Sequence, residues 1–311
     1  MNRVTATDKL RVVYVAGSGH TGSTLLAMLL NAHPQLVSVG ETSIKPKIRR
    51  RGDGATQKCS CGALIVECAF WQEVFQRVSE AGHDFSAHTW NNDYRSAHPL
   101  VHRVLSRDSS HKPIRWLQHW SADHLPIYSH RVHQTDRVNV AFIRAVLDTA
   151  KADVFVDTSK HVLRMARLMT LPDLDVKTIT LVRDVRGYAA SAKRRGLSIV
   201  DAASSWRKDQ EAIQHVTRHL APERKFLLRY EDLCVAPEEM LRRLYAFCGV
   251  REIEPITSLA STDHHVIGNS MRFQSAIRPR LDETWKSRLE QDEQRRVLSV
   301  AGHVNQRFGY V

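Results

Sequence analysis

Short apolar runs alternate with amphipathic segments along most of the chain. Runs rich in Val, Ile and Leu predict buried strands at 11–16, 37–39, 154–157, 176–182 and 225–229. Apolar residues spaced three and four apart predict helices at 23–31, 70–80, 138–150, 161–169, 186–195, 202–219, 238–247 and 283–303. Because strands and helices alternate repeatedly, the pattern predicts an α/β fold with a central parallel sheet covered on both faces.

One stretch departs from this alternation. Residues 83–136 are rich in His, Ser and Trp and have weak periodicity, which favours a lid or acceptor-binding insertion over a separate domain. We therefore expect residues 1–311 to form a single domain. We expect no transmembrane segment, because no apolar run approaches the roughly 20 residues that cross a bilayer. We expect no signal peptide either, because the N-terminus is polar.

The charge balance and the cysteine count bear on partners and compartment. Lys and Arg number 45 against 33 Asp and Glu, a formal net charge of +12. Such an excess favours polyanions, including nucleic acid, anionic lipid and multiply phosphorylated nucleotides, although a solvated basic surface explains it equally well. The five cysteines are an odd number in a long chain, which argues against a disulfide scaffold. A reducing, cytoplasmic location is the simpler interpretation.

A glycine-rich loop joins the first predicted strand to the first predicted helix. From Gly17 to Thr24 its spacing matches the nucleotide phosphate loop G-x-x-x-x-G-K-[ST]. Such loops aim backbone N–H groups and a helix N-terminus at phosphate oxygens. Ser23 replaces the lysine that ATP and GTP chemistry requires. The loop therefore predicts anion binding and argues against a kinase, while a tight turn that binds nothing is the simpler alternative.

A second polar block ends the strand at 176–182. Arg183 and Asp184 follow the strand directly, and Ser191 lies on the next predicted helix. Parallel α/β sheets bind ligands at the carboxyl ends of their strands, and a guanidinium fork suits a phosphate dianion. Taken alone, the block is explained as well by a surface ion pair between Arg183 and Asp184.

Together the two blocks resemble sulfotransferases that use 3′-phosphoadenosine-5′-phosphosulfate (PAPS). Residues 20–24, His-Thr-Gly-Ser-Thr, are similar to the family's 5′-phosphosulfate loop, [KR]-[ST]-G-[ST]-T, with His20 in place of the usual Lys or Arg. Arg183 through Ser191 resembles the family's 3′-phosphate motif. Supporting segments resemble the family at 39–41 (Val-Gly-Glu, tyrosylprotein-type), 157–160 (Asp-x-Ser-Lys), 229–233 (Arg-Tyr-Glu-Asp-Leu) and 265–272 (His-x-x-Gly-Asn-x-x-Arg).

The resemblance implies a P-loop NTPase-like three-layer fold and transfer of a sulfuryl group from PAPS to a hydroxyl or amine. It implies adenosine 3′,5′-bisphosphate as product, no metal, and no nucleic acid partner. The acceptor stays open among carbohydrate, peptide, lipid and small molecules. The implied nucleotide contacts are Gly19, His20, Thr21, Gly22, Ser23, Thr24, Arg183, Ser191 and Arg272.

Three residues are candidate catalytic residues. Glu41 is the general base by resemblance, and His20 is a cationic donor because a polyanion favours the protonated imidazole. Lys160 is a further cation beside the sulfuryl group or the acceptor. The alternatives are a salt bridge from Glu41 to the basic run 45–51 and a solvent-facing Lys160.

Other interpretations of the sequence rest on different residues. Asp157 could be a Mg²⁺ ligand in a kinase with an altered loop, and the basic charge could serve a nucleic-acid-binding protein without catalysis. Cys59, Cys61 and Cys68 offer three soft ligands, but zinc normally takes four and no histidine is close in sequence. Free thiols or a local disulfide are therefore favoured over a metal site.

Overall fold

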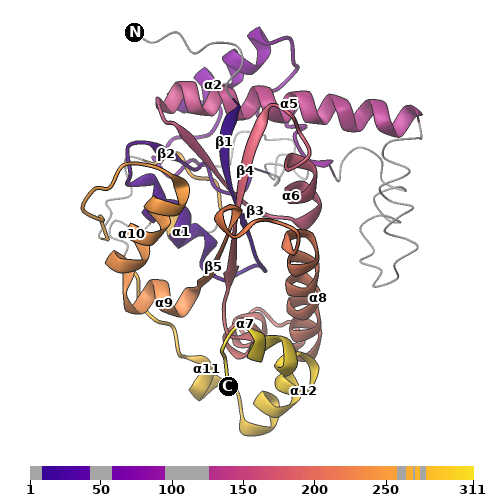
Figure 1. Ribbon diagram of the computed structural model, residues 1–311, viewed down its shortest axis with the longest axis vertical. Helices are drawn as coiled ribbons and strands as arrows, with labels where there is room; N and C mark the ends of the chain where they lie inside the picture. The colour runs from indigo at the N-terminus through magenta and orange to yellow at the C-terminus, as the bar shows by residue number, and fades with distance from the viewer. Residues whose placement is uncertain (1–8, 43–57, 95–125, 258–263, 269, 274–277) are drawn as a thin grey trace.

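A five-stranded parallel sheet forms the centre of the computed structural model (Figure 1). The structure describes residues 9–42, 58–94, 126–257, 264–268, 270–273 and 278–311. The strand order is β2-β3-β1-β4-β5, and every pairing is parallel. The strands are β1 (Leu10–Ala16), β2 (Leu36–Val37), β3 (Val154–Lys160), β4 (Leu174–Val182) and β5 (Lys225–Arg229).

The central strand β1 divides its side chains between two cores. Val12, Tyr14 and Ala16 belong to one apolar cluster, whereas Val13 and Val15 belong to the other. Successive side chains of a strand point to opposite faces, so a strand buried on both faces has to be apolar throughout. This explains why β1 is a continuous apolar run rather than an alternating one.

Helices cover both faces of the sheet (Figure 1). The Val13 side is covered by α1 (Ser23–Asn31), α9 (Tyr230–Val235) and α10 (Pro237–Cys248). The Tyr14 side is covered by α2 (Ala69–Glu80), α5 (Pro126–Ala150) and α6 (Val162–Leu168), where Phe142 meets Phe155 edge-on at 6.1 Å. These layers confirm the predicted three-layer α/β fold.

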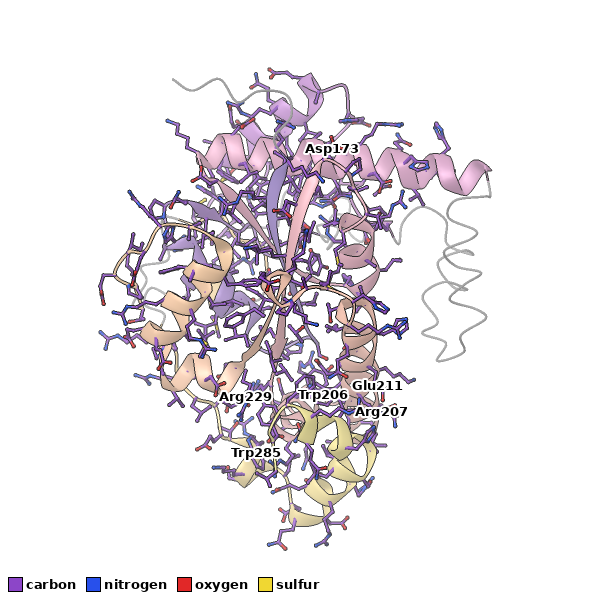
Figure 2. All side chains as sticks on the ribbon, in the orientation of Figure 1. Asp173, Trp206, Arg207, Glu211, Arg229 and Trp285 are labelled. Atoms are coloured by element: carbon purple, nitrogen blue, oxygen red, sulfur yellow. The ribbon has the colours of Figure 1, made fainter. Side chains whose placement is uncertain are left out.

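A third apolar cluster lies beyond the carboxyl end of β4. It joins α7 (Val185–Lys193), α8 (Ile199–Thr217) and α12 (Gln291–Arg307) around the buried Trp206, which Figure 2 labels. The short α11 (Trp285–Arg288) packs on α7. Two short 3₁₀ turns, Pro222–Arg224 and Ser270–Phe273, complete the assigned elements of the described residues.

Apart from shifts of one to four residues at the ends of most elements, the structure differs from the predicted elements in three places. The helix predicted at 138–150 begins at Pro126, so the irregular insertion ends earlier than predicted, and its residues 95–125 lie outside the described part. The helix predicted at 283–303 is divided into α11 and α12 by Leu289 and Glu290. The helix α9 directly follows β5 and was not predicted.

The two ends of the sheet carry different candidate residues. Asp173 precedes β4 at the amino-terminal end, whereas Arg229 closes β5 at the other end (Figure 2). The glycine loop follows the carboxyl end of β1, and Arg183 follows that of β4. Lys160 is the last residue of β3. Among the described residues, no helix combines the length and the apolar character needed to cross a membrane.

Candidate active site

The glycine loop leaves β1 and enters α1 at Gly22. Gly22 is the N-cap of α1 and has φ 93°, in the left-handed region. A Cβ at Gly22 would lie 2.7 Å from the ring of Tyr230, so both the backbone conformation and the neighbouring ring require glycine. Inside the loop, Thr21 donates to the carbonyl of Ser18 at 2.9 Å. Gln210 of α8 donates to the Ser18 hydroxyl at 3.3 Å.

The outer side of the loop is open. A Cβ at Gly19 would meet no other atom within 4 Å. The side chains of Ser23 and Thr24 are buried in the first turn of α1. Because the first turn of a helix has unpaired N–H groups and a positive dipole end, an anion can approach the backbone where the loop is open.

Glu41, Lys160 and Ser23 meet beside this loop. Glu41 follows β2, and Lys160 ends β3 with a left-handed φ of 68°. The Lys160 ammonium pairs with the Glu41 carboxylate and also donates to the Ser23 hydroxyl at 3.2 Å. The two charged side chains are only 15% and 19% exposed. Lys160 is therefore held at the loop rather than facing solvent, and Glu41 has an ion-pair partner other than the run at 45–51, which lies outside the described residues.

Arg183 lies at the carboxyl end of β4, as predicted, and is largely buried. It pairs with the Asp282 carboxylate at 3.0 Å and donates to the Asp282 carbonyl at 2.9 Å. Its guanidinium also stacks 4.6 Å from the ring centroid of Tyr230. Burial raises the pKa of Asp282, but hydrogen bonds from Thr284 and Arg183 outweigh it and lower this pKa to about 2. The guanidinium is thus fixed in place by an anionic partner.

Ser191 lies on α7 and is buried next to two arginines that the sequence analysis did not single out. Arg194 donates to its hydroxyl at 3.3 Å, and Arg195 donates to its carbonyl at 3.2 Å. Both arginines are exposed. The signal was available in the sequence, because the run Lys193–Arg195 follows Ser191 after a single residue.

His20 is surrounded by positive charge. Its side chain reaches solvent, but partial burial, followed by the charges of Arg195, Lys160, Arg194 and Arg183, lowers its pKa to about 4. Without a bound anion the imidazole is therefore neutral at pH 7. In this state the positive charge expected at His20 is supplied by its cationic neighbours. Protonation of His20 requires a negative ligand.

Arg272 has partners on the backbone next to the loop. Its guanidinium donates to the Gly268 carbonyl, and to the Lys58 carbonyl at 3.2 Å. It also stacks on Phe273 at 4.1 Å. Gly268 in turn lies against Thr24, where an added Cβ would be 3.4 Å from the threonine hydroxyl. Through these contacts Arg272 supports the backbone behind the loop, so its predicted contact with the nucleotide stays a prediction.

Asp157 does not have the environment of a Mg²⁺ ligand. Its carboxylate pairs with Arg164 at 2.8 Å and accepts from the backbone N–H of Ser159 at 2.9 Å. Asp157 and Arg164 are 0% and 2% exposed. Arg164 also donates to Asn139 at 2.6 Å. The carboxylate is thus committed to a buried hydrogen-bond network, which argues against the kinase interpretation.

Comparison with known proteins agrees with this geometry. A family model described as "Sulfotransferase family" matches residues 13–255, which is most of the chain. The chain therefore belongs to the sulfotransferase family, a class of transferase enzymes. No curated protein matches the chain.

Two solved structures have the same fold over almost the whole chain. The sulfotransferase domain of the Synechococcus PCC 7002 olefin synthase is 18% identical, with a TM-score of 0.54, covering 100% of this chain and 98% of that one. The sulfotransferase domain from the curacin biosynthetic pathway is 18% identical, with a TM-score of 0.52, covering 98% of this chain and 99% of that one. At this identity the likeness concerns the fold.

Proposed function

We propose that this protein transfers a sulfuryl group from PAPS to a hydroxyl or amine of an acceptor. The observation that carries the proposal is the arrangement around His20. Lys160 donates to Ser23 in the first turn of α1 at 3.2 Å, and Arg194 and Arg195 both donate to Ser191. Together with Arg183, these cations also lower the pKa of His20. These cations surround a loop that opens to solvent at Gly19, and a donor with a 3′-phosphate, a 5′-phosphate and a sulfate has the matching charge.

The residues fit the two ends of this donor. Backbone N–H groups from Gly19 to Thr24, with the N-terminus of α1, would hold the phosphosulfate. Arg183 and Ser191, together with the neighbouring Arg194 and Arg195, would hold the 3′-phosphate. When bound, PAPS supplies the sulfuryl group and a leaving group that accepts the electrons of the broken S–O bond.

Glu41 is the general base in this proposal. An acceptor hydroxyl loses its proton as its oxygen attacks sulfur, and a carboxylate oxygen of Glu41 would take that proton. Lys160 already holds this carboxylate beside Ser23 and the phosphate loop. The same ammonium would stabilise the negative charge that develops on the donor oxygens as the S–O bond breaks.

A binding experiment separates this proposal from the two alternatives. The full chain should bind adenosine 3′,5′-bisphosphate without added metal, and more tightly than it binds ATP with Mg²⁺ or a duplex oligonucleotide. Transfer from radiolabelled PAPS would then be screened with carbohydrate, peptide, lipid and small-molecule acceptors. A preference for ATP with Mg²⁺, or for the oligonucleotide, would rule the proposal out.

A further inference from the structure

Three thiols and one imidazole converge at the amino-terminal end of α2. Cys59, Cys61 and Cys68 come from the segment that leads into α2, and Cys68 is the N-cap of this helix. His265 lies 197 positions after Cys68. The three sulfur atoms and one ring nitrogen all lie within 4.8 Å of one another. All five cysteines of the chain are free thiols, which excludes the local disulfide considered from the sequence.

Three of the six distances between these atoms match the edges of a metal-centred tetrahedron, and all six are within 4.8 Å. His265 Nδ1 lies 3.5 Å from Cys59 Sγ and 3.4 Å from Cys68 Sγ. Cys61 Sγ lies 3.7 Å from Cys68 Sγ. Tetrahedral zinc, with Zn–S bonds of about 2.3 Å and Zn–N bonds of about 2.0–2.1 Å, separates two sulfurs by about 3.8 Å and a sulfur from a nitrogen by about 3.5 Å.

The backbone around the first two thiols forms a tight turn. The N–H of Cys59 donates to the Ala63 carbonyl at 2.8 Å, and the N–H of Gly62 donates to the Cys59 carbonyl at 3.0 Å. Gly62 has φ 92°, in the left-handed region that favours glycine. The turn brings the Cys59 and Cys61 thiols toward the same point, and the N–H of Cys68 donates to the Leu64 carbonyl at 2.8 Å.

His265 is oriented from two sides. Its ring stacks on Phe70 with centroids 4.4 Å apart and an interplanar angle of 3°. The Ser60 hydroxyl, between the first two cysteines, donates to the His264 carbonyl and accepts from the Val266 N–H at 2.8 Å. The backbone on both sides of the histidine is therefore fastened to the cysteine turn. Such support outside the ligands is typical of built metal sites.

We propose that Cys59, Cys61, Cys68 and His265 Nδ1 bind a structural Zn²⁺ ion. Thiolate and imidazole ligands suit zinc, and a site closed by four protein ligands is structural rather than catalytic. Cys59 and Cys68 are 0% and 2% exposed, which leaves little room for water at the ion. The sequence could not predict the fourth ligand because His265 reaches the cysteines only through the fold.

The ion would connect the cysteine segment to a second segment that supports the candidate base. Ile267, two residues after His265, accepts from the N–H of Glu41 at 3.0 Å and donates to the Val39 carbonyl at 2.8 Å. Zinc binding is independent of the reaction catalysed, whereas any effect of the ion on turnover rests on the proposed role of Glu41. Because none of the four ligands is a candidate catalytic residue, removal of the ion should reduce stability before it reduces turnover per folded molecule.

The test begins with the metal content of the full chain, purified under reducing conditions. We expect about one zinc per chain by elemental analysis. Chelation should lower the melting temperature, and Zn²⁺ but not Mg²⁺ should restore it. Co²⁺ added to the stripped protein should produce the intense ligand-field and thiolate charge-transfer bands of a tetrahedral thiolate site.

Variants identify the ligands. Cys61→Ser and His265→Ala should each lose stoichiometric zinc, whereas Cys234→Ala, a buried cysteine of α9 outside the cluster, should keep it. Zinc retained equally in all three would overturn the proposal. The proposal would also be overturned if the wild-type chain took up neither zinc nor cobalt after reduction and reconstitution. This measurement does not depend on whether a variant folds. Zinc binding without PAPS turnover would leave the metal site standing and count against the proposed function alone.

Discussion

Lys160 donates a hydrogen bond to Glu41 across 119 positions of sequence, and the same ammonium reaches Ser23 in the first turn of α1. The contact joins the end of β3 to the segment after β2 at the mouth of the phosphate loop. One cation is thereby shared between the carboxylate that we propose as base and the loop that we propose as donor site. Substitution of Glu41 should therefore affect turnover alone, whereas substitution of Lys160 should affect both donor binding and turnover.

The first prediction concerns Glu41. Glu41→Gln should lower kcat by about 10²- to 10⁴-fold, the usual contribution of a general base. It should leave the affinity for adenosine 3′,5′-bisphosphate nearly unchanged, because the carboxylate would act on the acceptor. The matched comparison is Lys160→Met, which should weaken bisphosphate binding as well as turnover. Turnover of Glu41→Gln close to that of the wild type would remove Glu41 from the role of base.

The second prediction concerns Arg183. Arg183→Ala should weaken the binding of adenosine 3′,5′-bisphosphate more than the binding of an analogue that lacks the 3′-phosphate. A charged hydrogen bond contributes about 1.5–3 kcal/mol, or about 10- to 150-fold in affinity. The control is Arg224→Ala, because Arg224 is half exposed, pairs with Asp175 and precedes β5 at the opposite end of the sheet. An equal loss for both nucleotides, measured by calorimetry, would contradict a contact with the 3′-phosphate.

The third prediction separates a structural carboxylate from a metal ligand. Asp157→Asn leaves the buried Arg164 without its charged partner. Breaking a buried pair in this way costs about 3–5 kcal/mol, which denaturant unfolding should reveal. Mg²⁺ should change neither bisphosphate affinity nor turnover in the wild type. Unaltered stability in Asp157→Asn, combined with Mg²⁺-dependent turnover in the wild type, would restore the kinase interpretation.

Local patterns explain why most of the fold could be predicted. The helix predicted at 23–31 has the same bounds as α1, and the strand predicted at 225–229 has the same bounds as β5. Each is decided by apolar periodicity and adjacent turn residues. The first part of α5 was missed because its polar, histidine-containing sequence has weak periodicity. Helix α9 was missed because Tyr230–Val235 is too short to show a helical repeat.

The candidate site was predictable only where its parts lie within one motif. The loop at 17–24 and the pair of Arg183 with Ser191 could be found because each depends on a short stretch of sequence. The contact of Arg183 with Asp282 spans 99 positions. No spacing rule connects such residues, because β4 and the segment before α11 meet only after the helices have packed. The pairing of Glu41 with Lys160 was missed for the same reason.

The fourth prediction concerns the protonation of His20. In the free protein, partial burial and four neighbouring cations lower its pKa from 6.5 to about 4. A bound polyanion should raise this pKa, because opposite charge favours the protonated imidazole. Binding of adenosine 3′,5′-bisphosphate should therefore take up protons between pH 4 and the raised value, and this contribution to affinity should grow as pH falls through that window.

The nucleotide's own phosphates also titrate in this range, so the His20 contribution has to be measured as a difference. Calorimetry at about pH 6, near the ordinary pKa of histidine, in buffers of different ionisation enthalpy gives the protons taken up by wild type and by His20→Gln. The wild type should take up more.

In the absence of ligand the unfolded chain binds the His20 proton first, so wild-type stability should fall relative to His20→Gln as pH drops from about 6.5 to about 4. His20→Lys should retain turnover, because a permanent cation replaces the one that the ligand induces. Equal proton uptake by wild type and His20→Gln, together with loss of turnover in His20→Lys, would show that the imidazole acts in its neutral form.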